Sequence, residues 1–254
     1  MYYSDVEKLA DSSVSKVNIA ETSLVKYFGR AIMAGIFIFL ATILSNVVGA
    51  VLSKNYPEAA KISGAGLFCF AIIAVVFFGG ELFTGNNLVM FVGLIKKKVN
   101  MKATLKIWIY SFIGNFIGIA LFAYIFVASG ASLELIKSYV EPIVNTKVNL
   151  SALQLIFRGI LCNFSVCLAV YSGIRLKTEC GKIIMMFFCV FTFVVAGFEH
   201  SIANLAVFSI AYFAFGTIPV IGVLNNLLWV VIGNIIGGGV LLGGLIHISS
   251  IKDN

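Results

Sequence analysis

Residues 81–86 read Glu-Leu-Phe-Thr-Gly-Asn, and residues 199–204 read Glu-His-Ser-Ile-Ala-Asn. Both stretches consist of Glu, three variable residues, a small residue and Asn, and both stand in the middle of a long apolar run. Carboxylates, imidazoles and amides are costly in hydrocarbon, so polar groups in such places indicate a pore or a substrate site. The two stretches therefore predict a membrane protein that passes something small across the bilayer.

The composition agrees with a membrane protein. Hydrophobic residues make up 60% of the chain and charged residues 11%, and the mean hydropathy is +1.04. A span needs ~20 apolar residues to cross a ~30 Å hydrocarbon core. Six runs are long enough, and we expect six crossings: 29–52, 63–95, 104–128, 152–173, 183–213 and 222–250.

The first residues do not read as a cleavable signal. Met1-Tyr2-Tyr3-Ser4-Asp5 carries an acid where such a signal carries basic residues followed by an apolar segment. We therefore expect residues 1–27 to be retained as an interfacial helix on the cytoplasmic side.

Two of the runs indicate broken helices. A single helix over 63–95 would be about 50 Å long, too long for one crossing and too short for two crossings with a turn. Gly79 and Gly80 precede the first motif and Gly197 precedes the second, and glycine permits unusual backbone. Non-helical backbone at membrane depth persists only inside protein or beside a cavity. The second and fifth spans are therefore predicted to be broken, with their motifs meeting at a central pathway.

The distribution of basic residues predicts the orientation. An excess of Lys and Arg marks the cytoplasmic side of a membrane protein, so we expect both termini in the cytoplasm. The net charge of +7 is therefore interpreted as a topology signal, and nothing in the sequence indicates binding to nucleic acid. The side expected to be cytoplasmic carries Lys8, Lys16, Lys26, Arg30, Lys96, Lys97, Lys98, Lys102, Lys106, Arg175, Lys177, Lys182 and Lys252, and the other side carries Lys54, Lys61, Lys137 and Lys147.

The two halves of the chain repeat each other beyond the opening motif. Residues 114–118 read Gly-Asn-Phe-Ile-Gly and residues 233–237 read Gly-Asn-Ile-Ile-Gly, while Arg30 and Arg158 begin a weaker third match. Each unit holds three spans, and because three is odd the second unit must be inverted relative to the first, with substrate near the midplane. We expect an all-α integral membrane protein with a six-span domain over 28–251, built from inverted three-helix repeats over about 28–128 and 152–250.

These residues resemble the formate/nitrite transporter family. The runs at 81–86 and 197–204 are similar to the family's two hallmark motifs, and the similarity extends over nearly the whole chain, including both Gly-Asn segments. The resemblance implies a homopentameric, aquaporin-like channel for small monovalent anions of weak acids, embedded in the lipid bilayer of the cell inner (plasma) membrane. Within the family the chain looks most like the clostridial hydrosulfide-conducting branch. Hydrosulfide is thus the expected substrate, with formate and nitrite as further ones.

Two residues are expected at the centre of the pathway. His200 stands in the second break; a histidine in an apolar span is more often a core residue, but its position in the repeat favours a functional role. Thr84 stands in the first break, and two interpretations remain open. In the first, its hydroxyl has a functional role and either binds an anion or fixes the His200 tautomer. In the second, its hydroxyl only caps the half-helix that follows.

Four polar residues are expected to support the breaks. A bare carboxylate would repel an anion, so Glu81 and Glu199 are interpreted as acceptors for backbone amides freed by the breaks, and Asn86 and Asn204 suit the same role. The half-helices after each break direct the positive ends of their dipoles at the midplane, which favours an anion there.

The resemblance also implies two hydrophobic constrictions, which would block hydrated ions by dewetting. Without it, these residues read as ordinary core or lipid-facing side chains. The inner constriction would comprise Leu82, Phe83, Ile72 and Val166, and the outer one Phe68 and Phe193.

Lys147 and Asn163 complete the expected site. By resemblance, Lys147 lies in the outer loop near the pore mouth and attracts anions; alternatively it is an ordinary solvated lysine. Asn163 is expected to orient the region of Thr84 and His200 by hydrogen bonding, with interhelical packing as the alternative.

Two other classes of function compete with a channel. A proton-coupled secondary transporter for the same anions would show saturating flux that needs a proton gradient. An intramembrane enzyme with Ser201 or Ser172 as nucleophile lacks a matched oxyanion motif and a second catalytic partner. The chain has no HExxH, phosphate-loop or GxSxG motif, so no cofactor or metal is expected. Its five cysteines lack paired metal-ligand spacing and are interpreted as small core residues.

Overall fold

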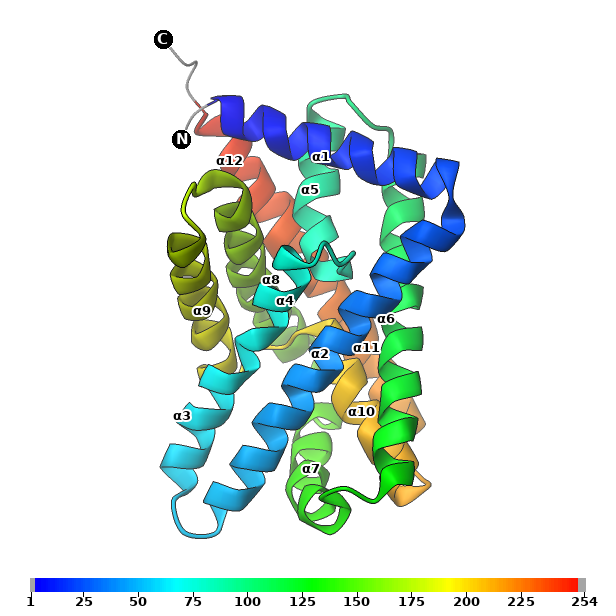
Figure 1. Cartoon of the computed structure of the whole chain (residues 1–254), viewed down its shortest axis with the longest axis vertical. Coiled ribbons are helices and arrows are strands. Elements are labelled where there is room, and N and C mark those ends of the chain that lie inside the picture. The colour runs from blue at the N-terminus through cyan, green and yellow to red at the C-terminus, as the bar shows by residue number, and fades with distance from the viewer. Residues whose placement is uncertain (1–2, 251–254) are drawn as a thin grey trace.

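The computed structural model describes residues 3–250, and Figure 1 shows an elongated bundle of helices. Parts of the predictions that fall on Met1, Tyr2, residue 251 and Lys252 lie outside the described residues. No strand occurs between residues 3 and 250. The helices are α1 (Tyr3–Thr22), α2 (Leu24–Ser53), α3 (Pro57–Phe68), α4 (Phe70–Phe77), α5 (Phe83–Ile95), α6 (Met101–Ser129), α7 (Leu133–Val148), α8 (Ala152–Arg175), α9 (Glu179–Val195), α10 (Ser201–Phe215), α11 (Val220–Asn234), the π-helical segment η1 (Ile235–Gly243) and α12 (Gly244–Ile248).

Five stretches in the described part of the chain are long and apolar enough to cross a membrane: Leu24–Ser53, Pro57–Phe77, Met101–Ser129, Ala152–Arg175 and Val220–Ile248. The expected fifth span is instead divided between α9 and α10, and α10 is a shorter apolar helix like α5. The protein is therefore a multi-pass, all-helical membrane protein.

The chain leaves helical geometry at both predicted breaks. Residues 78–82 separate α4 from α5, and residues 196–200 separate α9 from α10. Gly79 has φ +69° and Gly197 has φ +73°, values that cost a residue with a Cβ atom roughly 1–2 kcal/mol. The structure also interrupts the second span at Cys69, between α3 and α4, which the sequence analysis did not anticipate.

The long helices approach one another closely at glycines. A Cβ atom on Gly118 of α6 would overlap the carbonyl oxygen of Ile32 in α2, and one on Gly237 of η1 would overlap the carbonyl oxygen of Ile160 in α8. Small residues let apolar helices pack backbone against backbone where lipid supplies no hydrophobic driving force.

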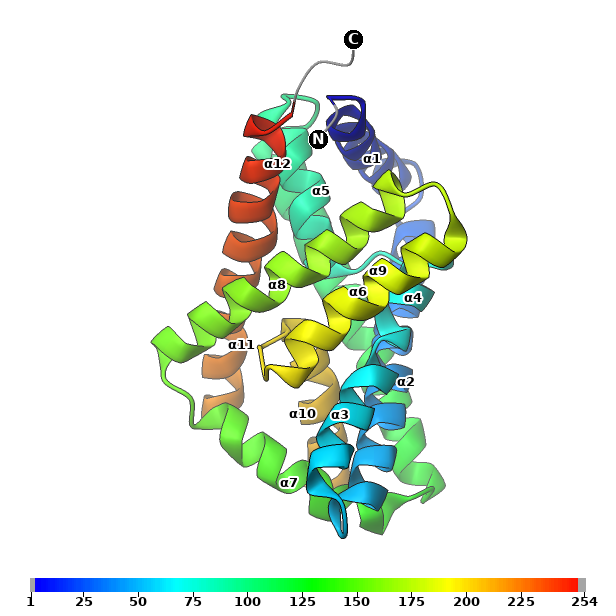
Figure 2. The same cartoon turned by 90° about the vertical axis from the view of Figure 1, so that its left-hand side faces the viewer.

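Helix α1 lies across one end of the bundle, the end that also holds α12 (Figures 1 and 2). Its apolar residues Val6, Leu9 and Ala10 are buried in one cluster with Leu88 of α5 and Ile246 of α12. Among its charged residues, Lys8 and Asp11 are exposed, whereas Asp5 is buried and Lys16 reaches the buried Glu81. The interfacial position of α1 stays a prediction. Helix α7 lies at the opposite end (Figure 1).

Candidate functional site

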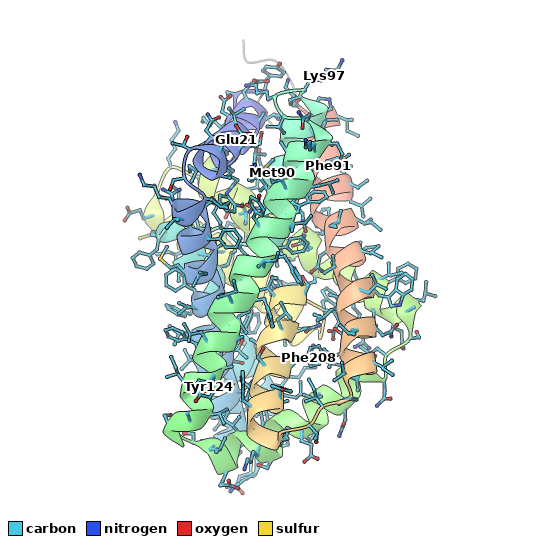
Figure 3. The ribbon with its side chains drawn as sticks, turned by 90° about the vertical axis from the view of Figure 1, so that its right-hand side faces the viewer. Glu21, Met90, Phe91, Lys97, Tyr124 and Phe208 are labelled. Atoms are coloured by element: carbon cyan, nitrogen blue, oxygen red, sulfur yellow. The ribbon has the colours of Figure 1, made fainter. Side chains whose placement is uncertain are left out.

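The two breaks meet in the middle of the molecule. Thr84 lies in the first turn of α5, His200 is the N-cap of α10, and Thr84 Oγ1 lies 3.0 Å from His200 Nε2. Both side chains are buried. Figure 3 labels Met90 on α5 and Phe208 on α10, which lie toward opposite ends of the molecule. The half-helices therefore run away from a shared centre, with their N-terminal ends at the Thr84–His200 contact.

The hydrogen bonds of His200 assign its tautomer. The backbone N–H of Ala203 donates to Nδ1 at 3.0 Å, so Nδ1 carries no proton and the neutral ring holds its hydrogen on Nε2. Nε2 then donates to Thr84 Oγ1, and the His200 ring stacks on Phe193 with centroids 5.8 Å apart. A second proton on the ring would displace the Ala203 cap, so this geometry holds His200 as a neutral donor. The Ala203 N–H thus sets the tautomer, and Thr84 Oγ1 accepts from Nε2. The role of Thr84 toward an anion stays a prediction.

Glu81 is held by side chains. Lys16 Nζ lies 2.9 and 2.7 Å from its two carboxylate oxygens, Asn86 Nδ2 donates at 3.1 Å, and the Tyr27 hydroxyl lies at 3.4 Å. Glu81 was expected to accept backbone amides instead. Because Lys16 belongs to α1, the first break is tied directly to the N-terminal helix.

Glu199 has the matching arrangement in the second half. Lys147 Nζ lies 2.9 Å from both carboxylate oxygens, and Asn204 Nδ2 donates at 2.6 Å. Lys147 lies in the last turn of α7 rather than in a loop, and its side chain is 17% exposed. It is thus a partly buried counter-ion and not a solvated lysine.

The amides freed by the first break go to a residue whose role the sequence analysis missed. Asn115 Oδ1 accepts from the Phe83 N–H at 2.9 Å, while its Nδ2 donates to the carbonyls of Ala31 and Glu81. The Glu81 N–H donates to the Arg30 carbonyl at 3.1 Å. Asn115 thus completes the hydrogen bonding of non-helical backbone, which a membrane interior requires.

Asn234 repeats this role at the second break. Its Oδ1 accepts from the Ser201 N–H at 3.0 Å, and its Nδ2 donates to the carbonyls of Gly159 and Glu199. The Glu199 N–H donates to the Arg158 carbonyl at 3.3 Å. The signal was in the sequence, because both asparagines belong to the repeated Gly-Asn segments.

Asn163 connects the centre to neighbouring helices. Its Nδ2 lies 3.2 Å from the Thr84 carbonyl oxygen, 2.9 Å from Asn87 Oδ1 and 2.7 Å from the Asn234 carbonyl oxygen. It therefore contacts the Thr84 backbone directly. Hydrogen bonding and interhelical packing coincide in this residue.

The expected constriction residues are all buried, which removes the lipid-facing interpretation. The rings of Phe68 and Phe193 meet edge to face with centroids 6.2 Å apart. Their role as gates stays a prediction. The buried set is Leu82, Phe83, Ile72, Val166, Phe68 and Phe193.

A cavity of about 360 Å³ lies in the half of the molecule away from α1. Phe68, Phe193 and His200 line it, together with Lys147 and Glu199. The second break therefore has one face on an open space.

The cysteines are mostly core residues, as expected, but Cys180 is exposed near the start of α9 and corrects that interpretation. Four cysteines are buried: Cys69, Cys162, Cys167 and Cys189. Ser172 Oγ bonds the Ala169 carbonyl of its own helix.

The Formate/nitrite transporter family model matches residues 4–248. The chain belongs to the formate/nitrite transporter family. It is 34% identical over 245 residues to the uncharacterized transporter YwcJ of Bacillus subtilis (strain 168), covering 95% of this chain and 96% of YwcJ.

Two solved structures agree with this membership. A protein described as an FNT family ion channel superposes with a TM-score of 0.91 at 26% identity, covering 98% of this chain and 100% of its own. A pentameric formate channel with formate bound superposes with a TM-score of 0.78 at 28% identity, covering 90% and 98%. The protein is thus a membrane transport protein of the formate/nitrite transporter family and not an enzyme, which removes the hypothesis of a Ser201 or Ser172 nucleophile.

Proposed function

We propose that this formate/nitrite transporter family member is a pentameric channel for small monovalent anions of weak acids, namely hydrosulfide, formate and nitrite. The observation that carries the proposal is the contact between Thr84 and His200, which joins two broken spans through a neutral hydrogen-bond donor. The family membership supports formate and nitrite as substrates. The pentameric formate channel, whose superposition covers 98% of that channel's chain, supports a pentameric assembly.

The architecture proposed is a set of six spans in two inverted repeats, with α3–α5 and α9–α10 as the broken members. The supporting observation is the matched hydrogen bonding of Asn115 on α6 and Asn234 on α11 to the first residues of the half-helices α5 and α10, which run to opposite ends. The described part of the chain thus comprises the interfacial helix α1 and one channel domain from α2 to α12. The basic residues Lys96, Lys97 and Lys98 at the α1 end support a cytoplasmic position for that end in the plasma membrane.

Transit is proposed to use three features in series. An ammonium group lies near each entrance, Lys147 paired with Glu199 on one side and Lys16 paired with Glu81 on the other. Because each pair is neutral, these groups serve as hydrogen-bond donors to the anion and not as a net positive charge. The phenylalanine and leucine constrictions strip water from the anion. Because a low-dielectric environment disfavours the charged form of a weak acid, the solute crosses as a near-neutral acid.

His200 then acts as a hydrogen-bond donor at the centre. Its Nε2–H points at Thr84 Oγ1 and is the polar group that an entering acid meets between the constrictions. Its Nδ1 is occupied by the Ala203 N–H. We therefore propose that His200 shares its Nε2 proton in a hydrogen bond and does not cycle through the imidazolium form.

Uptake by purified protein in proteoliposomes tests this function. Hydrosulfide, formate, nitrite and chloride are compared with and without an imposed proton gradient. The proposal predicts rapid flux of the three weak-acid anions that exceeds that of chloride and continues without the gradient. Flux that needs the gradient would instead identify a proton-coupled transporter, and flux of no anion would contradict both.

A further inference from the structure

The cavity of about 360 Å³ in the half of the molecule away from α1, which we call the outer cavity, is lined by polar groups beyond Lys147, Glu199 and His200. Several of them are satisfied by their own helices: Thr42 Oγ1 donates to the Ile38 carbonyl at 2.8 Å, and Thr146 Oγ1 donates to the Pro142 carbonyl at 2.9 Å. These hydroxyls have no hydrogen left to give to an occupant of the cavity. Two stronger donors in the wall, from different helices, are not satisfied in this way.

The first unsatisfied donor is Asn46 of α2. The residue lines the cavity, is only 8% exposed, and its Nδ2 has no hydrogen-bond partner among residues 3–250. A buried amide without a partner is costly, and such groups are rare unless water or a ligand satisfies them. Asn46 lines the cavity, but its Nδ2 atom is almost fully covered, so the side chain must rotate for an acceptor in the cavity to reach it.

The second is Arg158 of α8, which is half-buried and also lines the cavity. Its carbonyl accepts from the Glu199 N–H, which fixes the residue beside the second break. Its guanidinium has neither an ion pair nor a hydrogen bond with residues 3–250. Glu199, the acid in the cavity wall, is paired with Lys147. A guanidinium stays protonated at any physiological pH.

The charge of the wall is positive on balance. Lys61, Lys147 and Arg158 line the cavity, and Glu199 is the one acid among its lining residues in the described chain. Since Glu199 compensates a single cation, the remaining positive charge raises the local concentration of anions.

We propose that Asn46 and Arg158 form an anion-capture subsite in the outer cavity, one that favours anions with two coplanar oxygens over hydrosulfide. A guanidinium presents paired N–H groups that match two oxygens of one anion, and the amide adds a further donor. Formate and nitrite have such a pair of oxygens, whereas hydrosulfide has a single sulfur, a weaker acceptor. This inference rests on the proposed function because it places the cavity on the conduction route.

The test uses the full-length protein in proteoliposomes and four variants. Arg158→Gln removes the charge and the fork, Arg158→Lys keeps the charge without the fork, and Asn46→Leu removes the amide at similar volume. Lys54→Gln is the matched control, because Lys54 is an exposed cation at the same end of the molecule that does not line the cavity. The half-saturating concentrations of formate and of hydrosulfide are measured for each variant.

We expect Arg158→Gln and Asn46→Leu to raise the half-saturating formate concentration, the former by about tenfold or more, as for loss of a charge-assisted hydrogen bond. Hydrosulfide should change by about twofold or less. For Arg158→Lys, the half-saturating concentration of hydrosulfide should equal the wild-type value, whereas that of formate should stay raised. Equal changes for the two anions, or values equal to those of Lys54→Gln, would overturn the subsite.

A binding measurement separates this inference from the proposed function. Saturation-transfer NMR of formate with detergent-solubilised protein reports capture without conduction. If the wild-type protein binds formate but conducts no anion, and Arg158→Gln binds no formate, the subsite is supported and the channel is contradicted. Conduction with formate binding unchanged in both Arg158→Gln and Asn46→Leu would support the channel and overturn the subsite.

Discussion

Lys147 and Glu199 form a symmetric ion pair in which Nζ lies 2.9 Å from each carboxylate oxygen, although 52 residues separate them in the chain. The Glu199 side chain is only 4% exposed. The pair joins α7, at the end of the molecule away from α1, to the second break. Lys16 and Glu81 make the equivalent connection from α1 to the first break.

Removal of Lys147 alone should destabilise the protein strongly. Lys147→Met leaves the Glu199 carboxylate buried without a counter-ion, which typically costs about 3 kcal/mol or more. The double variant Lys147→Met/Glu199→Gln should recover much of this loss because no charge remains. Thermal unfolding in detergent measures both. Lys137→Met, at an exposed pair with Glu134, serves as the control and should change little; a single variant as stable as this control would disprove the structural role of the pair.

Asn234 should be more sensitive to substitution than its uncharged side chain suggests. Asn234→Ala leaves the Ser201 N–H and the carbonyls of Gly159 and Glu199 without their partner, so we expect a loss of about 2 kcal/mol or more of stability. Asn234→Asp keeps an oxygen that accepts from the Ser201 N–H but loses the two bonds that Nδ2 donates. It should be more stable than Asn234→Ala only if the bond to Ser201 contributes more than those two bonds. Chemical or thermal unfolding compares the variants. An Ala variant with wild-type stability would show that the break does not depend on Asn234.

Adding one methyl group should have different effects on stability at two glycines of the last span. Gly237→Ala places a Cβ atom on the Ile160 carbonyl and should cost roughly 1–3 kcal/mol. Gly244→Ala, seven residues further along, meets nothing within 4 Å and lies in a helix, so it should be neutral or slightly stabilising. Unfolding temperatures of the two variants test the close approach of η1 and α8. The reverse order of stability would contradict that packing.

Docking of α1 should persist to low pH. Hydrogen bonds from Lys96, then Lys98, lower the pKa of Glu7 from 4.5 to about 2. Because the pKa is lower in the docked state, the contribution of Glu7 is complete above about pH 4.5 and is lost as the pH falls through 2. The difference in protease accessibility of α1 between wild type and Glu7→Gln should be constant above about pH 5 and vanish near pH 2. A midpoint above pH 5 would show that other groups hold α1.

The sequence predicted the broken spans because their causes are local. Gly79 and Gly197 precede polar motifs in apolar runs, and both adopt positive φ. The interruption at Cys69 has no such local signal. The π-helical turn at Ile235–Gly243 also went unpredicted, although it contains the glycines that pack against α8.

The pairing of the charged residues was not predictable from the sequence. Lys16 and Glu81 lie 65 residues apart, and neither helical periodicity nor the repeat indicates which lysine reaches which carboxylate. The role of Asn115 and Asn234 was missed for a different reason. Their repeat was recognised as a sign of symmetry, but the need of the freed N–H groups for an acceptor was assigned to the glutamates.

We propose that the His200 Nε2–H, placed against Thr84, is the polar contact that a weak acid meets between the proposed constrictions. His200→Asn tests it most directly, because asparagine is a good N-cap that still accepts from the Ala203 N–H while the Nε2 donor is removed. Formate and hydrosulfide uptake into proteoliposomes is measured for both proteins across pH. We expect at least a tenfold loss of flux in a variant that stays folded. Flux equal to that of the wild type would show that conduction does not depend on the His200 Nε2–H.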